Sequence, residues 1–197
     1  MKIVTTNLPD VLLIEPTVHG DTRGYFFEAF RADLYAAAGI SGPFVQDNVS
    51  RSRRGVLRGL HFQQPYAQRK LVSVVEGEVF DVAVDVRLDS PTFGRSTGHV
   101  LSAESRRQLY IPEGFAHGFL TLSEQAVFVY KCSEYYRPEA EHLLRWDDPE
   151  IGIDWPTRDV LLSARDASAQ SLRELGRDLA RAGVGSLRAV EVGAACS

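Results

Sequence analysis

A histidine follows an arginine by three residues in the segment 55–63 (GVLRGLHFQ), which is otherwise apolar and typical of a β-strand. The imidazole of histidine titrates near neutral pH, so His61 is a side chain that can accept a proton and return it. In a regular strand residues i and i+2 share a face, whereas residues i and i+3 do not. Arg58 and His61 can therefore serve one site only if Gly59 bends or bulges the backbone. The alternative is a core histidine with one satisfied hydrogen bond.

A second histidine stands in the segment 112–119 (PEGFAHGF), whose Pro-x-Gly-x-x-His pattern resembles the second motif of cupins. Pro112 and Gly114 shape a tight turn, and the strand that follows points His117 into a barrel. The metal-binding version of that fold also needs a His-x-His pair and a glutamate in its first motif, and this sequence has neither there. The five histidines are His19, His61, His99, His117 and His142. No two of them have the spacing of local metal ligands, so we expect no metal site, and an ion held by histidines distant in sequence remains the alternative.

Short β-branched or aromatic runs, separated by turn residues, make up the elements that must position these side chains. They span residues 71–75, 79–86, 98–101, 107–111, 119–122 and 126–130, with turns at 90–94 (SPTFG) and 123–125. This spacing predicts a β-sandwich or barrel. Helical periodicity predicts helices over 31–38, ending at Gly39, and over 172–182, where leucines recur on one face. We expect the second helix to pack on the outside of the barrel.

Length, charge and cysteine content narrow the class of protein further. A chain of 197 residues with a net charge of −4 fits one domain and has no basic stretch of the kind that binds nucleic acid. We expect residues 1–167 to form the main unit and residues 168–197 a helix and tail that either belong to it or are partly mobile from about Gly183. Cys132 and Cys196 lie far apart, which favours a reducing compartment over a disulfide framework. No run has the length of a membrane span or of a signal-peptide core, so the sequence predicts a cytoplasmic protein.

Seven segments, in order from about Leu12 to Ala167, resemble the dTDP-4-dehydrorhamnose 3,5-epimerases, cupins of the rhamnose pathway. The segments are 21–28 (DTRGYFFE), 45–48 (VQDN), 55–63 (GVLRGLHFQ), 77–85 (GEVFDVAVD), 90–94 (SPTFG), 112–119 (PEGFAHGF) and 163–167 (SARDA). The resemblance implies an all-β cupin-type jelly-roll barrel or sandwich with short peripheral helices, including a C-terminal one. It also implies a homodimer in which an N-terminal strand or arm of one chain adds to the partner's sheet and helps line its site.

The implied reaction is epimerisation at carbons 3 and 5 of dTDP-4-dehydro-6-deoxy-D-glucose, which gives dTDP-4-dehydro-L-rhamnose. The ketone at carbon 4 acidifies the protons on both neighbouring carbons, so no cofactor is needed. Such an enzyme needs a base, an acid on the opposite face of the sugar and a group that holds the enolate charge.

The resemblance assigns four catalytic residues. His61 is the base, Asp166 pairs with it and fixes its tautomer, Tyr130 donates the proton, and Lys70 lies near the enolate oxygen. Each has a structural alternative when read without the family. Asp166 could be a helix N-cap, a role that nearby serines could equally supply, Tyr130 a core aromatic residue and Lys70 a lysine at a strand edge.

The same resemblance assigns the residues that bind the nucleotide sugar. Arginines suit the diphosphate and an aromatic ring suits the thymine. The arginines for the anionic and sugar part are Arg23, Arg58 and Arg165, with Gln46, Asp47, Asn48, Lys70 and His117 lining the site; Tyr136 stacks on thymine, with Glu28 and Glu141 at the nucleoside. Two departures from the family pattern stand out. Arg165 replaces a common lysine, and Arg69 directly precedes Lys70.

Three other functions stay open at this point. The first is a 3-only epimerase of a dTDP-4-keto-6-deoxy sugar, or more distantly a sugar-nucleotide ketoisomerase. The second is a cupin that binds a ligand without catalysis. The third is a metal-dependent dioxygenase or isomerase, which predicts a stoichiometric metal and inhibition by a chelator.

Overall fold

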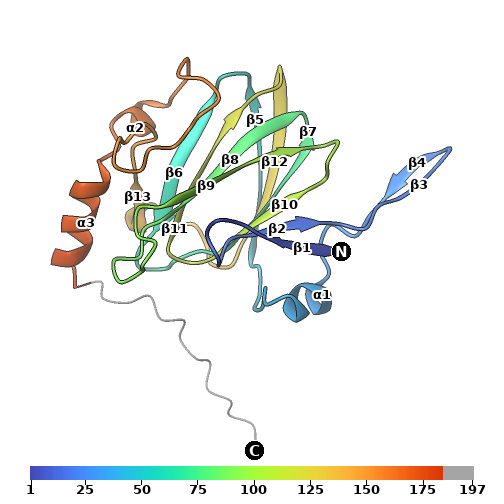
Figure 1. The fold of residues 1–197 in the computed structure, drawn as a ribbon, viewed down its shortest axis with the longest axis horizontal. Coiled ribbons are helices and arrows are strands. Elements are labelled where there is room, and N and C mark those ends of the chain that lie inside the picture. The colour runs from blue at the N-terminus through green and yellow to red at the C-terminus, as the bar shows by residue number, and fades with distance from the viewer. Residues whose placement is uncertain (184–197) are drawn as a thin grey trace, which may run out of the picture.

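The computed structural model describes residues 1–183, which form two antiparallel β-sheets packed face to face (Figure 1). The larger sheet has the order β1-β2-β10-β7-β12-β5, and its strands are β1 (Lys2–Thr5), β2 (Leu12–Glu15), β10 (Gln108–Ile111), β7 (Lys70–Glu76), β12 (Gln125–Cys132) and β5 (Gln46–Arg53). The smaller sheet has the order β13-β6-β11-β8-β9, and its strands are β13 (Glu141–Leu143), β6 (Leu57–Gln63), β11 (Phe115–Thr121), β8 (Glu78–Asp85) and β9 (Ser96–Ser102). These two sheets do not close into one barrel, and the predicted all-β cupin-type fold is confirmed as a sandwich.

Side-chain alternation along the strands produces three apolar clusters. The inner cluster lies between the sheets and includes Leu13, Val72, Val79, Ala83, Leu109, Phe119 and Phe128. The α3 cluster covers the outer face of the smaller sheet and includes Leu57, Leu60, Phe62, Val82, Val84 and Leu120, together with Leu172, Leu175 and Leu179. The α1 cluster covers part of the outer face of the larger sheet and contains Ile14, Tyr35, Ile40, Leu71 and Tyr110. Both sheets bury apolar residues on their outer faces as well as between them. The fold is therefore stabilised by burial of apolar surface in three clusters rather than in one.

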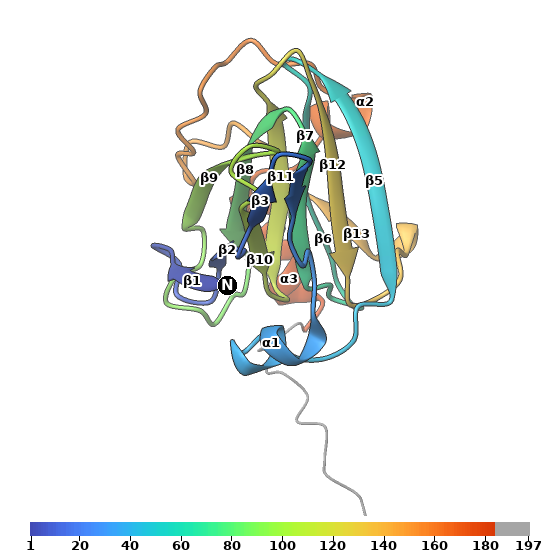
Figure 2. The same ribbon diagram turned by 90° about the vertical axis from the view of Figure 1, so that its right-hand side faces the viewer.

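The helices flank the sandwich, as the sequence predicts. The helix α1 (Ala32–Ala37) is followed by Gly39 at φ +85° and lies at one end of the molecule (Figure 2). The helix α3 (Leu172–Arg181) begins with a capping box, in which Ser171 and Glu174 bind each other's backbone N–H groups. Its buried leucines pack on the smaller sheet, outside the sandwich, as expected. A further single-turn helix, α2 (Ala164–Ala167), and a short 3₁₀ turn, η1 (Pro138–Ala140), complete the elements.

All six predicted strand runs are strands, although β11 begins at Phe115 rather than at residue 119. A separate hairpin of β3 (His19–Asp21) and β4 (Gly24–Phe26) projects from the body, opposite α2 and α3 (Figure 1). The predicted mobility of the tail beyond Gly183 concerns residues outside those described. Among the helices of residues 1–183, none is long and apolar enough to cross a membrane.

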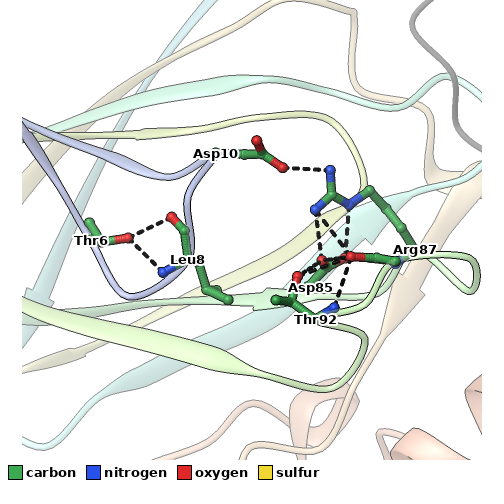
Figure 3. Close-up of polar contacts among 7 residues, drawn as sticks. Thr6, Leu8, Asp10, Asp85, Arg87 and Thr92 are labelled. Carbon is green, nitrogen blue, oxygen red and sulfur yellow. Dashed lines mark hydrogen bonds and ion pairs between the residues drawn. The ribbon is translucent and has the colours of Figure 1, made fainter.

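A buried carboxylate holds the turn between β8 and β9 (Figure 3). Asp85 is 0% exposed and accepts hydrogen bonds from Arg87, from Ser90 Oγ at 2.6 Å and from Thr92 Oγ1 at 2.6 Å. Burial alone would raise the pKa of Asp85, but these hydrogen bonds hold it below its usual range. The Arg87 guanidinium also donates to Asp10 at 2.8 Å, which ties the N-terminal segment to this turn. The predicted turn at 90–94 is therefore a rigid corner of the sandwich.

Candidate active site

The larger sheet presents polar side chains to the space between the sheets at one end of the sandwich. Strand register places Gln46, Cys132 and Lys70 in one row across β5, β12 and β7, and places Asn48 beside Tyr130 in the next. Because alternate residues of a strand share a face, these side chains point inward together. The apolar inner cluster gives way here to a polar wall.

The smaller sheet faces this wall with His61, and a bulge in β6 brings it there. His61 lies opposite His117 on β11, whereas Arg58 lies opposite Phe119, so two residues of β6 face one residue of β11. Gly59 has a φ of +102°, and a Cβ at this position would lie 2.5 Å from the carbonyl oxygen of His117. The bulge that a shared face for Arg58 and His61 requires is therefore present, and only glycine fits it.

A cavity of about 280 Å³ lies between these two walls. It is lined by Gln46, Asn48, His61, Phe62, Gln63, Gln68, Lys70, Tyr130, Cys132, Tyr136 and Glu141. Seven of these are site residues predicted from the sequence: Gln46, Asn48, His61, Lys70, Tyr130, Tyr136 and Glu141. The fold thus brings together side chains from five strands, the loop between β6 and β7 and the segment after β12.

A buried carboxylate orients the His61 ring. The Nε2–H of His61 donates to Asp166 Oδ1 at 2.6 Å, which leaves Nδ1 with the lone pair that can accept a proton. Ser163 is the N-cap of α2, and its Oγ accepts from the Asp166 N–H at 3.1 Å and donates to Asp166 Oδ2 at 2.7 Å. The N-cap alternative for Asp166 is therefore wrong. Burial alone would raise the pKa of Asp166, but the hydrogen bonds from His61 and Ser163 hold it below its usual range, so the carboxylate stays ionised beside the imidazole.

Tyr130 and Lys70 carry shifted pKa values on the facing wall. Burial raises the pKa of the Tyr130 phenol, which keeps it protonated and able to donate a proton at neutral pH. Burial lowers the pKa of Lys70, while the negative charges nearby, Glu141 among them, oppose that effect. Burial also raises the pKa of Cys132, so its thiol is neutral at pH 7.

Glu141, Tyr136 and Arg165 form a connected group at the mouth of the cavity. The Tyr136 hydroxyl donates to Glu141 Oε2 at 3.1 Å, and Arg165 donates to the same oxygen. Glu141 Oε1 lies 3.8 Å from His61 Nδ1, too far for a hydrogen bond but close enough for its charge to act on the ring. Gln46 accepts a hydrogen bond from the backbone N–H of Tyr136 at 2.8 Å, which links this group to β5.

His117 lies beside His61 on the neighbouring strand β11 but is not among the residues that line the cavity. Its Nε2–H donates to Asp81 Oδ2 at 2.9 Å, and both side chains are buried. Burial lowers the pKa of His117 despite the opposing charge of Asp81, so the ring is neutral at pH 7.

The other predicted binding residues lie outside the cavity of this single chain. Asp47 points to the opposite face of β5 and pairs with Lys131 at 3.0 Å. Arg58 points inward beside the cavity and donates to Ser52 at 2.9 Å. Arg23 lies in the turn of the β3–β4 hairpin, which projects from the body (Figure 1), and Glu28 follows β4; neither lines the cavity.

Four cavity residues are not among the predicted ones: Phe62, Gln63, Gln68 and Cys132. The signal for Cys132 is its position two residues after Tyr130 in one strand, and the signal for Gln63 is the same spacing after His61. Gln63 is buried and donates to the carbonyl oxygens of Tyr66 and Tyr135, so it shapes the cavity wall. Residues 1–183 contain no group of three or more histidine, cysteine or acidic side chains placed to hold a metal ion.

Comparison with known proteins agrees with this geometry. The family model described as dTDP-4-dehydrorhamnose 3,5-epimerase matches residues 5–174. The dTDP-4-dehydrorhamnose 3,5-epimerase of Shigella flexneri is 54% identical over 172 residues, which cover 86% of this chain and 95% of that protein.

Two solved structures show the same fold. The dTDP-6-deoxy-D-glucose-3,5-epimerase of Legionella pneumophila, in complex with dTDP-4-keto-L-rhamnose, is 53% identical with a TM-score of 0.86 and covers 88% of this chain and 96% of its own. ChmJ, a 3'-monoepimerase of Streptomyces bikiniensis in complex with dTDP-quinovose, is 38% identical with a TM-score of 0.82 and covers 91% and 90% of the two chains. The protein described here belongs to the dTDP-4-dehydrorhamnose 3,5-epimerase family.

Proposed function

We propose that this cavity epimerises carbons 3 and 5 of dTDP-4-dehydro-6-deoxy-D-glucose, with His61 as the base and Tyr130 as the acid, to give dTDP-4-dehydro-L-rhamnose. One observation carries the proposal: the carboxylate-bound His61 on one sheet faces Tyr130 and Lys70 on the other across a single cavity. A base and an acid on opposite walls can reach opposite faces of one sugar ring, which inversion at a carbon requires.

The chemistry needs only the groups on these walls. His61 Nδ1 takes the proton from carbon 3, and the electron pair of the broken C–H bond moves into the ketone to form an enolate. The Lys70 ammonium holds the negative oxygen, and Tyr130 gives its phenolic proton to the other face of the carbon. His61 then releases its proton to water and Tyr130 regains one from water, after which the same steps at carbon 5 complete the reaction. We expect full activity in the presence of a chelator, because the ketone itself acidifies both protons.

Residues around the cavity mouth bind the nucleotide end of the substrate. We assign the thymine to Tyr136, with Glu141 beside it, and the sugar and diphosphate to polar and cationic side chains. The supporting geometry is that Tyr136 and Glu141 line the cavity and that Arg165 lies next to Glu141. The residues for the sugar and diphosphate are Gln46, Asp47, Asn48, Arg58, Lys70, His117 and Arg165, together with Arg23 and Glu28.

We infer a homodimer in which the β3–β4 hairpin of one chain brings Arg23 and Glu28 to the cavity of the other. The hairpin carries two aromatic side chains exposed to solvent, Tyr25 at 58% and Phe26 at 66%, and β5 ends the larger sheet with Val49 at 71% exposure. Apolar side chains on a projecting arm and at a sheet edge are typical of surfaces that a second subunit covers. Light scattering after size-exclusion chromatography should give twice the mass of the chain, and a monomer would rule out the shared site.

We place the enzyme in the cytoplasm, where nucleotide sugars are made and few disulfides form.

The decisive experiment is proton NMR of dTDP-4-keto-6-deoxyglucose incubated with the enzyme in heavy water. Loss of the signals at both carbon 3 and carbon 5 is the expected result, because each carbon regains a deuteron after His61 has removed its proton. Loss at carbon 3 alone would assign the enzyme to the 3-only epimerases. ChmJ, a 3'-monoepimerase, has the same fold. The absence of exchange at either carbon would contradict the proposal.

A pair of variants separates the two roles. His61→Asn should abolish exchange at both carbons while dTDP still binds, because the amide cannot take the proton. Tyr130→Phe should keep proton removal by His61 but slow inversion, since the acid on the other face is gone. Equal loss of exchange in both variants would contradict the assignment of base and acid to opposite walls.

A further inference from the structure

The sandwich buries a second histidine–carboxylate pair beneath the cavity, and the proposed chemistry gives its carboxylate no role. Asp81 on β8 is 0% exposed and His117 on β11 is 7% exposed, and their side chains are hydrogen-bonded at 2.9 Å. His117 lies directly opposite His61 in the register of β6 and β11. The protein therefore sets two histidines side by side, each bound to its own buried carboxylate.

Only one of the two oxygens of the Asp81 carboxylate has a hydrogen-bond partner among the described residues. Its Oδ2 accepts from His117, whereas its Oδ1 is buried and has no hydrogen-bond partner within residues 1–183. A buried charge needs an opposite charge close by, or it is not tolerated. His99 on β9 lies directly opposite Asp81, and His117 on β11 is its hydrogen-bond partner. Strand alternation turns both Asp81 on β8 and Lys70 on β7 into the space between the sheets, where both side chains are buried. Burial lowers the pKa of both histidines, which leaves Lys70 as the cation that balances Asp81.

Lys70 in turn depends on the charges around it. Three groups oppose the effect of burial on its pKa: Cys132 on β12, Glu141 on β13 and Asp81 on β8. The Cys132 thiol is neutral at pH 7, because burial raises its pKa, and Glu141 already binds Arg165. The His117 ring, whose pKa burial lowers, adds no positive charge to this group. Asp81 is therefore the anion in this group that has no cation other than Lys70.

We propose that Asp81 is a positioning residue of the epimerase, which keeps Lys70 cationic beneath the substrate's ketone. This inference rests on the proposed function, in which the Lys70 ammonium holds the enolate oxygen. The enolate exists only in the reaction and not in the bound ground state. Loss of Asp81 should therefore lower kcat and leave KM nearly unchanged.

The test is Asp81→Asn, which keeps the size of the side chain and removes its charge. We expect kcat to fall by roughly 10- to 100-fold, since Asp81 acts through Lys70 rather than on the substrate itself. The alkaline limb of the kcat profile should move to lower pH by about one unit or more, because Lys70 without its anion loses its proton sooner. Thr121→Val is the matched control: Thr121 lies on β11 and its buried hydroxyl has no hydrogen-bond partner within residues 1–183, so neither kcat nor the profile should change.

The effect of Asp81→Asn in a Lys70→Met enzyme separates this role from a structural one. In a Lys70→Met enzyme, Asp81→Asn should lower kcat no further, because the group through which it acts is already gone. An unchanged alkaline limb in Asp81→Asn, or an equal fall of kcat in both backgrounds, would overturn the proposal. Asp81→Ser, which leaves room for a water, takes its place if Asp81→Asn does not fold.

The charge of Lys70 can also be measured without substrate. An NMR titration of the Lys70 ammonium in the ligand-free protein should show a lower pKa in the Asp81 variant than in the wild type. This readout stands apart from the proposed function. If the wild type exchanged no substrate protons, the proposed function would fail, while the titration would still decide whether Asp81 supports the charge on Lys70.

Discussion

The pairing of His61 with Asp166 is the residue-scale feature on which the proposed chemistry depends. The 2.6 Å hydrogen bond places the proton on Nε2 and leaves Nδ1 free as the base. In Asp166→Asn the amide can donate to the ring and favour the other tautomer. We therefore expect kcat to fall by about 100-fold or more, while KM for the nucleotide sugar changes little.

Steady-state kinetics, with calorimetric titration of dTDP as a test of binding, would measure this effect. Ser168→Ala is the matched control, because Ser168 ends the same short helix and binds the Arg165 carbonyl oxygen without touching His61. A variant at Asp166 that kept the wild-type kcat would show that the carboxylate does not set the tautomer.

Residue types alone could not have identified this pair. Asp166 follows His61 by 105 positions, so no spacing rule connects them, and the assignment came from the family resemblance. Residues within one strand were more predictable. The need for a bulge at Gly59 followed from Arg58 and His61 having to share a face, and the register of β6 and β11 shows that bulge.

At the scale of elements, the bulge in β6 makes Gly59 the least replaceable residue of that strand. Gly59→Ala would place a Cβ 2.5 Å from the His117 oxygen and 2.7 Å from the Gly118 Cα, at a φ of +102°. Both contacts are with backbone, which cannot move aside without disturbing the sheet. We expect a loss of about 2–4 kcal/mol in the free energy of unfolding, measured by urea denaturation.

A glycine without these constraints serves as the control. Gly176 lies in α3, and a Cβ there would make only ordinary contacts with side chains, at 3.6 Å from the Phe93 ring and 3.9 Å from Leu88 Cδ2. Gly176→Ala should stabilise the protein by about 0.5–1 kcal/mol, because alanine is the better helix former. A Gly59 variant as stable as the wild type would show that β6 does not need the bulge.

Three elements that the sequence did not predict, β5, the β3–β4 hairpin and α2, share a physical reason. The strand β5 (QDNVSRSR) turns polar side chains toward the cavity, so it lacks the apolar alternation of an ordinary strand. The strands of the β3–β4 hairpin bury nothing within this chain, and α2 is a single turn. Runs of apolar residues predict elements that pack in a core, and segments that line the site or project from the body lack that signal.

At the scale of the whole molecule, α3 joins the C-terminal part of the described chain to the smaller sheet. We predict one cooperative unit for residues 1–183 rather than a separable end after residue 167. Leu175 is 0% exposed in the α3 cluster, and Leu175→Ala should cost about 2–5 kcal/mol of stability. Circular dichroism and tryptophan fluorescence should report the same single transition in the variant.

Leu161→Ala, at a residue 44% exposed, should change the unfolding free energy much less. Two separate transitions in the Leu175 variant would mean that α3 folds apart from the sandwich.

The distribution of apolar clusters has a consequence for laboratory evolution of this enzyme. The α3 and α1 clusters lie on the outer faces of the sheets and the inner cluster fills one end of the space between them, so most of the buried apolar side chains do not line the cavity. Lining residues such as Gln46, Asn48 and Tyr136 can therefore be randomised with little loss of folded protein. A library at these positions should be rich in folded variants, and selection on it can reach altered nucleotide preference before stability becomes limiting.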